Sequence, residues 1–235
     1  MPKLATLPEK KLKLRTLEQK TKELNALYEK YKTCTACSLG LSRIKFVFGV
    51  GAPNSEVLFI GEGPGYSEDR SGEPFIGRAG QLLDKILGSI GLSRQLNAYI
   101  ANIVKCHPMV NPQTPDERGN DRPPTPEEVA TCSPILQQQI IILQPRFVVT
   151  LGSPSTKAVL RTAEGISKVR GKVVPFPVET FFSAPSSFSE EDLAPIQKTQ
   201  VIPTYHPAAL LRNPNLKADV WEDMKLLRDL LKKDE

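Results

Sequence analysis

The sequence predicts an α/β protein with a mainly parallel central sheet and helices on both faces, a three-layer α/β/α arrangement. Two observations predict this class. Apolar runs of strand length alternate along the chain with amphipathic segments of helix length, which is typical of parallel strands joined by crossover helices. The chain also has 235 residues, of which 40% are hydrophobic, so it can enclose a substantial core.

The first predicted element is an amphipathic helix that ends near Cys34. Its apolar residues recur at helical spacing between lysine and glutamate residues, so one face should pack on the core: Leu17, Leu24, Leu27, Tyr28 and Tyr31. Apolar runs then predict strands over residues 45–50, 57–60, 98–104, 147–151, 173–176 and 201–205. Helical periodicity predicts helices over residues 81–90, 127–143, 155–161 and 218–231.

Two segments interrupt this alternation. Residues 107–126 contain six prolines in twenty positions, and residues 177–200 mix serine, proline, phenylalanine and acidic residues. Neither pattern predicts a regular element, so both segments are expected to be surface insertions or mobile loops. Residues 1–33 are expected to form a basic, amphipathic helical extension, and residues 34–235 one domain that carries both insertions.

The net charge of +5 is concentrated at the N-terminus. Residues 1–32 contain nine Lys or Arg and four Glu, whereas residues 33–235 contain 22 basic and 22 acidic residues. Overall charge therefore does not predict nucleic-acid binding by the core, which would have to concentrate its basic residues locally. The N-terminal charges are either the solvated face of a helix or a tether for DNA.

Membrane association is not expected from this sequence. No apolar run approaches the ~18 residues of a membrane span, and the start of the chain lacks the apolar stretch of a signal peptide. We therefore expect a cytoplasmic protein without a membrane partner.

The cysteines are Cys34, Cys37, Cys106 and Cys132. A disulfide scaffold is not expected in a cytoplasmic chain with a core of this size. Cys34 and Cys37 have the C-x-x-C spacing of metal ligands, and the other two could converge with them from a strand end and a helix. Zinc and an iron–sulfur cluster would both accept these ligands. The alternative is a fortuitous C-x-x-C with two buried thiols.

A glycine-rich turn, Gly61-Glu62-Gly63-Pro64-Gly65, follows the predicted strand 57–60. Its backbone N–H groups could approach a planar or anionic ligand closely. A dinucleotide fingerprint is the alternative, but Pro64 and the lack of G-x-G-x-x-G spacing argue against it. Glu62, Glu68 and Asp69 bring carboxylates to this turn. Such groups can order water or stabilise a cationic sugar, or they can be helix caps and solvated acids.

Three further residues are notable for their position. Phe75 is either a core residue or a stacking platform for a base. Asn102 lies in an apolar run, where its one acceptor and two donors must find partners in the backbone or in a ligand. His206 precedes Pro207, which forces an extended exit from the predicted strand and leaves the ring at the carboxyl edge of the sheet, where α/β folds place their ligands. The second histidine, His107, is assigned no role.

The motifs together resemble the iron–sulfur uracil-DNA glycosylases, family 4 of the uracil-DNA glycosylase superfamily. The residues that carry the resemblance are the glycine-rich turn with Glu68 and Asp69, the nonapeptide that runs from His206 to Pro214, and the four cysteines in this order. The resemblance extends from about Cys34 to Leu230. It departs from the family in the gap between Cys106 and Cys132, which is wider than usual.

The resemblance implies a monofunctional enzyme of base excision repair. Such an enzyme flips deoxyuridine out of single- or double-stranded DNA, hydrolyses the N-glycosidic bond and leaves an abasic site. It implies a structural [4Fe–4S] cluster on the four cysteines in preference to zinc. A monomer is expected.

The resemblance also implies a role for each matched residue. In uracil binding, Phe75 stacks on the base, Asn102 pairs with N3–H and O4, and the Gly63 backbone and His206 stabilise the departing uracil anion. Glu62 or Glu68 acts on the water or the sugar cation, and Glu68 could also crowd a thymine methyl group. Of the DNA-binding residues, Leu210 and Leu211 fill the gap left by the flipped base and Arg212 binds phosphate.

Two other functions are compatible with parts of the sequence. One is a non-catalytic or covalently trapping relative that binds uracil-containing DNA; however, residues 107–126 lack the additional histidine and the Lys/Arg cluster of the trapping relatives. The other is a zinc-stabilised nucleotide-binding module whose turn holds a phosphate. The identity of the metal and a glycosylase assay distinguish the three.

Overall fold

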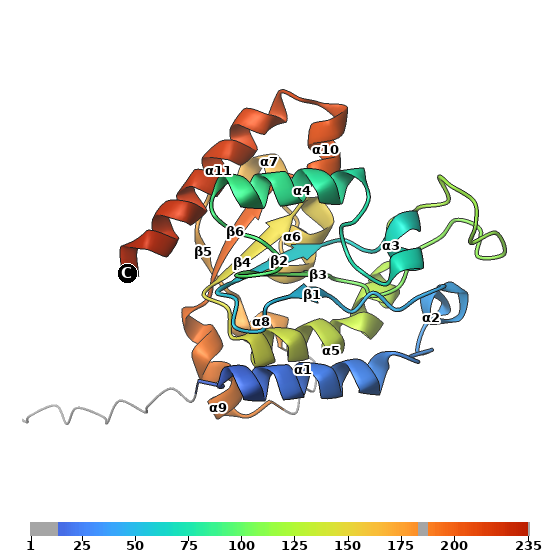
Figure 1. Cartoon of the computed structure of the whole chain (residues 1–235), viewed down its shortest axis with the longest axis horizontal. Helices are drawn as coiled ribbons and strands as arrows, with labels where there is room; N and C mark the ends of the chain where they lie inside the picture. The colour runs from blue at the N-terminus through green and yellow to red at the C-terminus, as the bar shows by residue number, and fades with distance from the viewer. Residues whose placement is uncertain (1–13, 183–187, 235) are drawn as a thin grey trace, which may run out of the picture.

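A computed structural model describes residues 14–182 and 188–234, and it confirms the three-layer α/β architecture (Figure 1). The sheet has the strand order β1-β3-β2-β4-β6-β5. These strands are β1 (Val50–Gly51), β2 (Val57–Gly61), β3 (Ala98–Asn102), β4 (Phe147–Leu151), β5 (Val174–Pro175) and β6 (Gln200–Thr204). The four central strands are parallel, and the short edge strands β1 and β5 are antiparallel to their neighbours.

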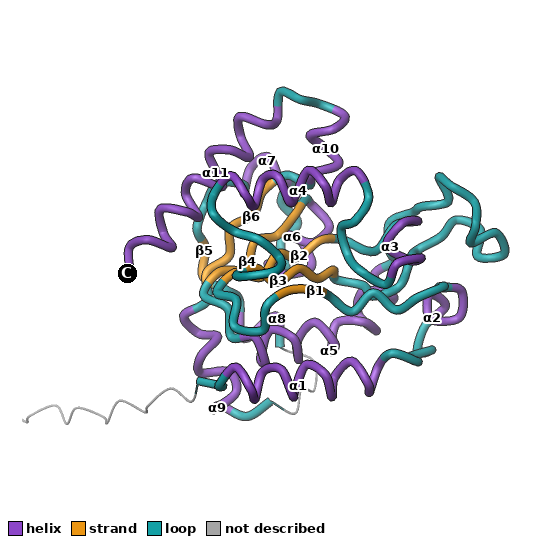
Figure 2. The backbone as a smooth tube through the Cα atoms, viewed as in Figure 1, coloured by secondary structure: helices purple, strands orange, loops and turns teal. Residues whose placement is uncertain are grey.

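Helices cover both faces of this sheet, as Figures 1 and 2 show. One face carries α1 (Leu17–Tyr31) and α5 (Pro126–Leu143), and the other carries α4 (Arg78–Ser89), α10 (Pro207–Arg212) and α11 (Leu216–Leu231). Alternate residues of a strand point to opposite faces. Leu58 and Ile60 of β2 therefore pack toward α1 and α5, whereas Val57 and Phe59 pack toward α4 and α11. All four are fully buried.

The remaining helices are short. They are α2 (Ser38–Ser42), α3 (Tyr66–Ser71), α6 (Ser153–Leu160), α7 (Ile166–Val169), α8 (Val178–Phe181), α9 (Glu190–Leu193), η1 (Ala194–Lys198) and η2 (Lys232–Asp234). The α6 helix corresponds to the predicted helix 155–161, whereas α2, α3, α7 and α10 are too short to show a helical period. Within the two described stretches, no helix combines the length and the apolar character needed to cross a membrane.

Two predicted strands are much shorter than expected. Of the predicted strand 45–50, only Val50 belongs to β1, which continues to Gly51. Gly49 and Gly51 have φ values of +145° and +146°, outside the range of a regular strand. Val47 instead donates a single backbone hydrogen bond to the Lys105 carbonyl (2.9 Å). Similarly, β5 retains only two residues of the predicted strand 173–176.

Residues 177–200 were expected to be a surface insertion or a mobile loop, but the part that the structure describes contains α8, α9 and η1 and contributes to the core. Phe181, Phe182 and Ile196 are buried in this segment. The rings of Phe181 and Phe182 meet edge to face, with centroids 5.1 Å apart, and Phe176 packs against both. These aromatic contacts attach the segment to the core beside α5 and explain why a stretch without helical or strand periodicity is ordered.

Residues 107–126 also form an ordered loop rather than a mobile one. Met109 is 2% exposed and forms a β-bridge with Asp121. The Asn120 side chain donates to the carbonyls of Asn111 and Thr114 and accepts from the Asn111 amide. Because these bonds satisfy backbone groups inside the loop, the many prolines do not leave it without structure.

Candidate active site

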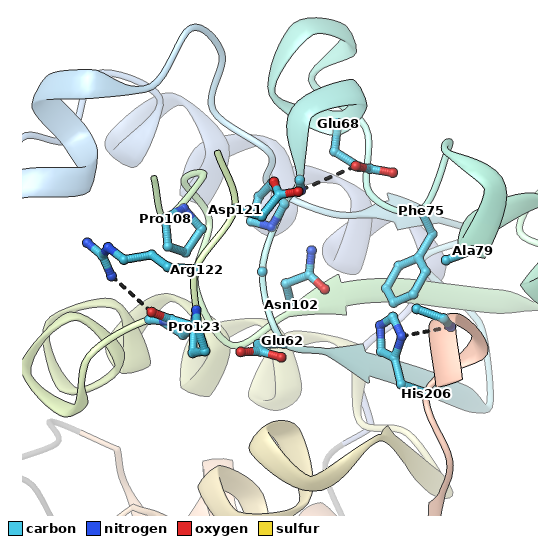
Figure 3. Close-up of a pocket in the computed structure, with 15 residues that line it drawn as sticks. Glu62, Glu68, Phe75, Ala79, Asn102, Pro108, Asp121, Arg122, Pro123 and His206 are labelled. Atoms are coloured by element: carbon cyan, nitrogen blue, oxygen red, sulfur yellow. Dashed lines mark hydrogen bonds between the residues drawn. The ribbon is translucent and has the colours of Figure 1, made fainter. Parts of the chain in front are cut away.

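A cavity of about 430 Å³ lies at the carboxyl ends of the parallel strands. Figure 3 shows it between the turn after β2, the end of β3, the segment after β6 and residues 107–126, which we call the proline-rich loop. Its lining contains every residue that the sequence placed in a base pocket: Glu62, Gly63, Glu68, Phe75, Asn102 and His206. Parallel strands explain this convergence, because their carboxyl ends meet at one edge of the sheet.

Asn102 supplies an unpaired hydrogen-bonding group to the cavity. Its side chain is 2% exposed, and its Oδ1 atom has no partner among the described residues. A buried acceptor without a partner is costly unless a ligand or water completes it. The neighbouring strand makes room for this side chain, because a Cβ atom on Gly61 would lie only 2.4 Å from Oδ1.

Phe75 brings an aromatic ring to the same place. The ring is buried, and its centroid lies 5.5 Å from that of His206 with the planes tilted by 32°. The backbone of Phe75 has a φ of +55°, in the left-handed region that non-glycine residues rarely adopt. A Cβ atom on Gly80 would lie 1.8 Å from the Phe75 carbonyl oxygen, so α4 can approach this residue only because position 80 has no side chain.

His206 is held in one orientation by the start of α10. It is the N-cap residue of that helix, and its Nδ1 atom accepts a hydrogen bond from the Ala208 amide (3.1 Å). Burial lowers the pKa of His206 to about 4, and the positive charge of Arg212 contributes in the same direction. The ring is therefore neutral at physiological pH, and the proton lies on Nε2 because Nδ1 is an acceptor.

The two predicted catalytic carboxylates differ in their environment. Glu68 binds three backbone amides, those of Gly65 (3.2 Å), Ile76 (2.9 Å) and Gly77 (2.9 Å), through both of its oxygens. Glu62 lines the cavity, and burial raises the pKa of its carboxyl group. The bonds of Glu68 argue against the prediction that it acts on water, because its acceptor sites are used to hold the two loops together.

The proline-rich loop supplies a wall that the sequence analysis did not predict. Pro108, Asp121, Arg122, Pro123 and Pro124 line the cavity. The Arg122 guanidinium forms two hydrogen bonds with Glu128 of α5 (2.7 and 2.8 Å), which fix the loop to the helix. The only available signal was the position of the loop directly after Asn102 and Cys106.

His107 is not an incidental residue. It is fully buried, its Nε2 atom lies 2.6 Å from Asp121 Oδ1, and its Nδ1 atom lies 3.8 Å from Asp69. Asp69 is also fully buried and accepts from the backbone amides of Ile44 and Lys45. The histidine thus connects the loop that carries Asp121 to the segment that precedes β1, through side chains with no apolar pattern in the sequence.

The structure separates the two leucines that were predicted to fill the gap in DNA. Leu210 is 2% exposed and packs in the apolar cluster under α4 and α11, so it is not available to insert between bases. Leu211 is 41% exposed, and Arg212 is exposed beside it. The prediction is therefore wrong for Leu210, because this side of α10 faces the core.

The thiols gather beyond the end of β3, on the face of the sheet that α1 and α5 cover. Cys106, Cys37 and Cys132 belong to the same apolar cluster, and Arg43 donates to Cys106 Sγ (3.3 Å) and to the Cys34 carbonyl. Burial raises the pKa of Cys106 to about 12 and also raises that of Cys132. Within the described ranges, no group of three or more His, Cys, Asp or Glu residues is placed to bind a single metal ion.

The first basic residues that the structure describes lie far from the cavity. Arg15 donates to the Ile141 carbonyl (3.0 Å), and Lys20 donates to the Leu143 carbonyl (2.6 Å), at the C-terminus of α5. Cations stabilise a helix C-terminus. That end of α5 leads into the amino end of β4, whereas the cavity is at the carboxyl ends of the strands. Residues 1–13, with the rest of the basic segment, lie outside the described residues.

Comparison with known proteins identifies the family. The family model of the uracil DNA glycosylase superfamily matches residues 48–225. A type-4 uracil-DNA glycosylase of Sulfurisphaera tokodaii is 38% identical over 88% of this chain and 84% of its own length. Similar enzymes of Thermotoga maritima and Archaeoglobus fulgidus are 37% and 35% identical over 88% of this chain, and over 93% and 92% of their own lengths. The chain therefore belongs to the uracil DNA glycosylase superfamily, and within it to the type-4 family.

Proposed function

We propose that this uracil-DNA glycosylase extrudes deoxyuridine from DNA into the cavity described above, hydrolyses its N-glycosidic bond and leaves an abasic site. The observation that carries the proposal is the unpaired Oδ1 atom of Asn102, which faces a cavity that also holds Phe75 and His206. Uracil offers N3–H to such an acceptor and O4 to the amide N–H group of the same side chain. The flat base would stack on the Phe75 ring.

The departing base needs stabilisation of the negative charge that develops on it. Neutral His206 can donate its Nε2 proton to uracil O2, and the Gly63 backbone N–H can support the same charge. A side chain at position 63 is excluded, because its Cβ atom would lie 2.9 Å from Val104. Glycine at this position therefore lets the turn pack against Val104 beside the cavity.

Glu62 is the stronger candidate of the two carboxylates for acting on water or on the sugar cation. Its side chain lines the cavity, and no hydrogen bond to another described residue holds it. Glu68 instead shapes the pocket by binding the amides on both sides of it. The proposed catalytic set is thus His206 and Glu62, with Glu68 as a positioning residue.

Residues next to the cavity would hold the DNA. Leu211 is exposed in the helix that His206 caps, and we propose that it fills the gap left by the flipped base. Arg212, also exposed, would bind a flanking phosphate. Extrusion is easiest at a mispair, so uracil opposite guanine should be processed at least as well as uracil opposite adenine.

Cys34, Cys37, Cys106 and Cys132 would hold a [4Fe–4S] cluster. The donor set fits, because it consists of thiols alone and because Arg43 and Lys105 bring positive charge to Cys106 and Cys132. When bound, the cluster would supply structural stability by joining the segment after α1 to the end of β3 and to α5. No catalytic step depends on it.

The test is cleavage of single- and double-stranded oligonucleotides that contain one uracil, followed by alkaline treatment of the abasic site. Strand cleavage that depends on uracil supports the proposal. A covalent protein–DNA adduct on a denaturing gel would indicate a trapping relative instead. Binding without either product would indicate a non-catalytic relative.

A further inference from the structure

The segment that carries Phe75 is clamped between two oppositely charged side chains. On one side, Glu68 accepts hydrogen bonds from the amides of Ile76 and Gly77 (both 2.9 Å). On the other side, Arg94 donates to the carbonyls of Pro74 (2.9 Å) and Phe75 (2.8 Å). The Glu68 carboxylate thus accepts from the backbone N–H groups of this short segment, and the Arg94 guanidinium donates to its backbone carbonyls.

Arg94 is itself fixed in place. It is 8% exposed, and its guanidinium forms an ion pair with Asp84 of α4 (2.8 Å) and a further hydrogen bond from Nε to the same carboxylate (2.9 Å). A buried guanidinium with five donors in a rigid plane can bridge a carboxylate and two carbonyls at once. Lysine, with one nitrogen, has no equivalent geometry.

Phe75 needs such support more than most residues do. Its left-handed backbone, at φ +55°, is costly for a bulky side chain and persists only where the surroundings over-determine it. Its carbonyl precedes α4, which begins at Arg78, and takes no part in the hydrogen bonding of that helix. Without Arg94, the two carbonyls would be left without these donors, and the segment would lose one side of its clamp.

We propose that Arg94 is a positioning residue for base recognition: by holding the Pro74 and Phe75 carbonyls, it keeps the Phe75 ring where an extruded base stacks, next to His206. The inference rests on the proposed function, since it assigns Arg94 to the pocket that would hold uracil. Arg94 acts through Phe75 and does not line the cavity.

The experiment is a double-mutant cycle with free uracil as the probe. Inhibition constants for uracil are measured by competition against cleavage of a uracil oligonucleotide, for the wild type, Arg94→Gln, Phe75→Ala and the double variant. Loss of base–aromatic stacking is expected to weaken uracil binding about tenfold. We therefore expect Arg94→Gln and Phe75→Ala each to raise the inhibition constant of uracil by about this factor. The inhibition constant of the double variant should be no higher than that of Phe75→Ala alone.

Arg146→Gln is the matched control. Arg146 also pairs with a carboxylate, Glu56 (3.1 Å), and with a backbone carbonyl, that of Leu230, but at the amino edge of the sheet. Its loss should lower the thermal midpoint without changing the inhibition constant of uracil. A wild-type inhibition constant in Arg94→Gln would overturn the proposal, and so would additive effects in the double variant.

If Arg94→Gln does not fold, Arg94→Lys replaces it under the same criteria, because lysine keeps the charge beside Asp84 but cannot bridge both carbonyls. Failure of the proposed function is separately visible. In that case the wild type would not cleave uracil-containing DNA at all. If the wild type cleaves and Phe75→Ala weakens uracil, only the role of Arg94 is being tested.

Discussion

The Nδ1 atom of His206 accepts a hydrogen bond from the Ala208 amide at 3.1 Å, so the first turn of α10 fixes the tautomer of the ring. In the neutral ring, the proton must then lie on Nε2, the atom that remains for a ligand. Burial of the ring lowers its pKa and thereby also favours the neutral form. The cavity therefore contains a neutral hydrogen-bond donor rather than a cation.

The pH dependence of cleavage should reflect this neutral histidine. Because the pKa of folded His206 is lowered to about 4, the single-turnover rate should show no titration of this ring between about pH 6 and 8. The check is a pH profile at saturating enzyme. A rate that follows a group titrating near the ordinary histidine pKa, about 6.5, and that loses this dependence in His206→Gln, would contradict the assignment.

Folding stability should depend on pH below this range, between the folded and the unfolded pKa of His206. The unfolded histidine titrates at its ordinary pKa of about 6.5 and the folded one lower, so the unfolded chain binds more protons between these values. The contribution of His206 is therefore fully present above the unfolded pKa and is lost as the pH falls toward 4. In denaturant unfolding, the free energy of unfolding should fall less between pH 7.5 and pH 5 for His206→Gln than for the wild type.

Replacement of the ring should separate catalysis from binding. If His206 stabilises the uracil anion, His206→Ala should reduce the single-turnover rate by a factor on the order of 100 to 1000, the effect of removing one preorganised donor. Affinity for uracil-containing DNA, measured with the same oligonucleotide, should change much less. Equal losses in binding and cleavage would instead indicate uniform binding by this residue.

Glu62 and Glu68 should respond differently to the same change. Glu68 accepts from Gly65 through one oxygen and from Ile76 and Gly77 through the other, so Glu68→Gln must turn an amide N–H₂ group toward at least one backbone donor. It should lower the free energy of unfolding by about 2 kcal/mol. Glu62→Gln should leave stability nearly unchanged and lower the single-turnover rate on the order of 100-fold. Denaturant unfolding and rapid quench of both variants provide the test. A slow but fully stable Glu68→Gln would restore the catalytic role to Glu68.

The sequence predicted the parts of this structure that depend on apolar periodicity. The strand over residues 147–151 has the predicted limits, and the carboxyl ends of the parallel strands bring Asn102 and His206 together as expected. Periodicity was less informative where the backbone, rather than side-chain burial, determines the conformation. The positive φ values of Gly49 and Gly51 shorten the first strand, and no apolar pattern reveals them.

Polar contacts across long sequence distances explain the remaining differences. Arg94 bonds to a segment about twenty residues away, and His107 connects Asp121 to Asp69. Neither set of contacts joins residues at a spacing that a sequence pattern would reveal. The face of a six-residue helix is similarly ambiguous, and for this reason Leu210 was expected at the surface and is found in the core.

The four cysteines give a prediction about composition and stability. Anaerobically purified protein should be brown and should contain iron and acid-labile sulfide, with broad visible absorption that oxidation alters. Cys34→Ser and Cys132→Ser should lower the thermal midpoint and solubility more than the rate constant of the folded fraction, because the cluster joins distant segments. Colourless, active protein with one zinc per chain would contradict the assignment.

The last prediction concerns the choice of base, which should depend on Asn102. Its amide can accept from uracil N3–H and donate to O4, whereas cytosine presents the reverse pattern at these positions. Asn102→Asp removes the donor to O4 and leaves a carboxylate, which can accept from the cytosine amino group. We expect a large loss of uracil excision and a weak new excision of unpaired or mispaired cytosine, limited because cytosine N3 would still face an acceptor unless one of the two is protonated. Parallel assays with uracil and cytosine oligonucleotides, across pH, measure both effects. Near wild-type uracil excision by this variant would exclude Asn102 from base recognition, despite its unpaired Oδ1 atom.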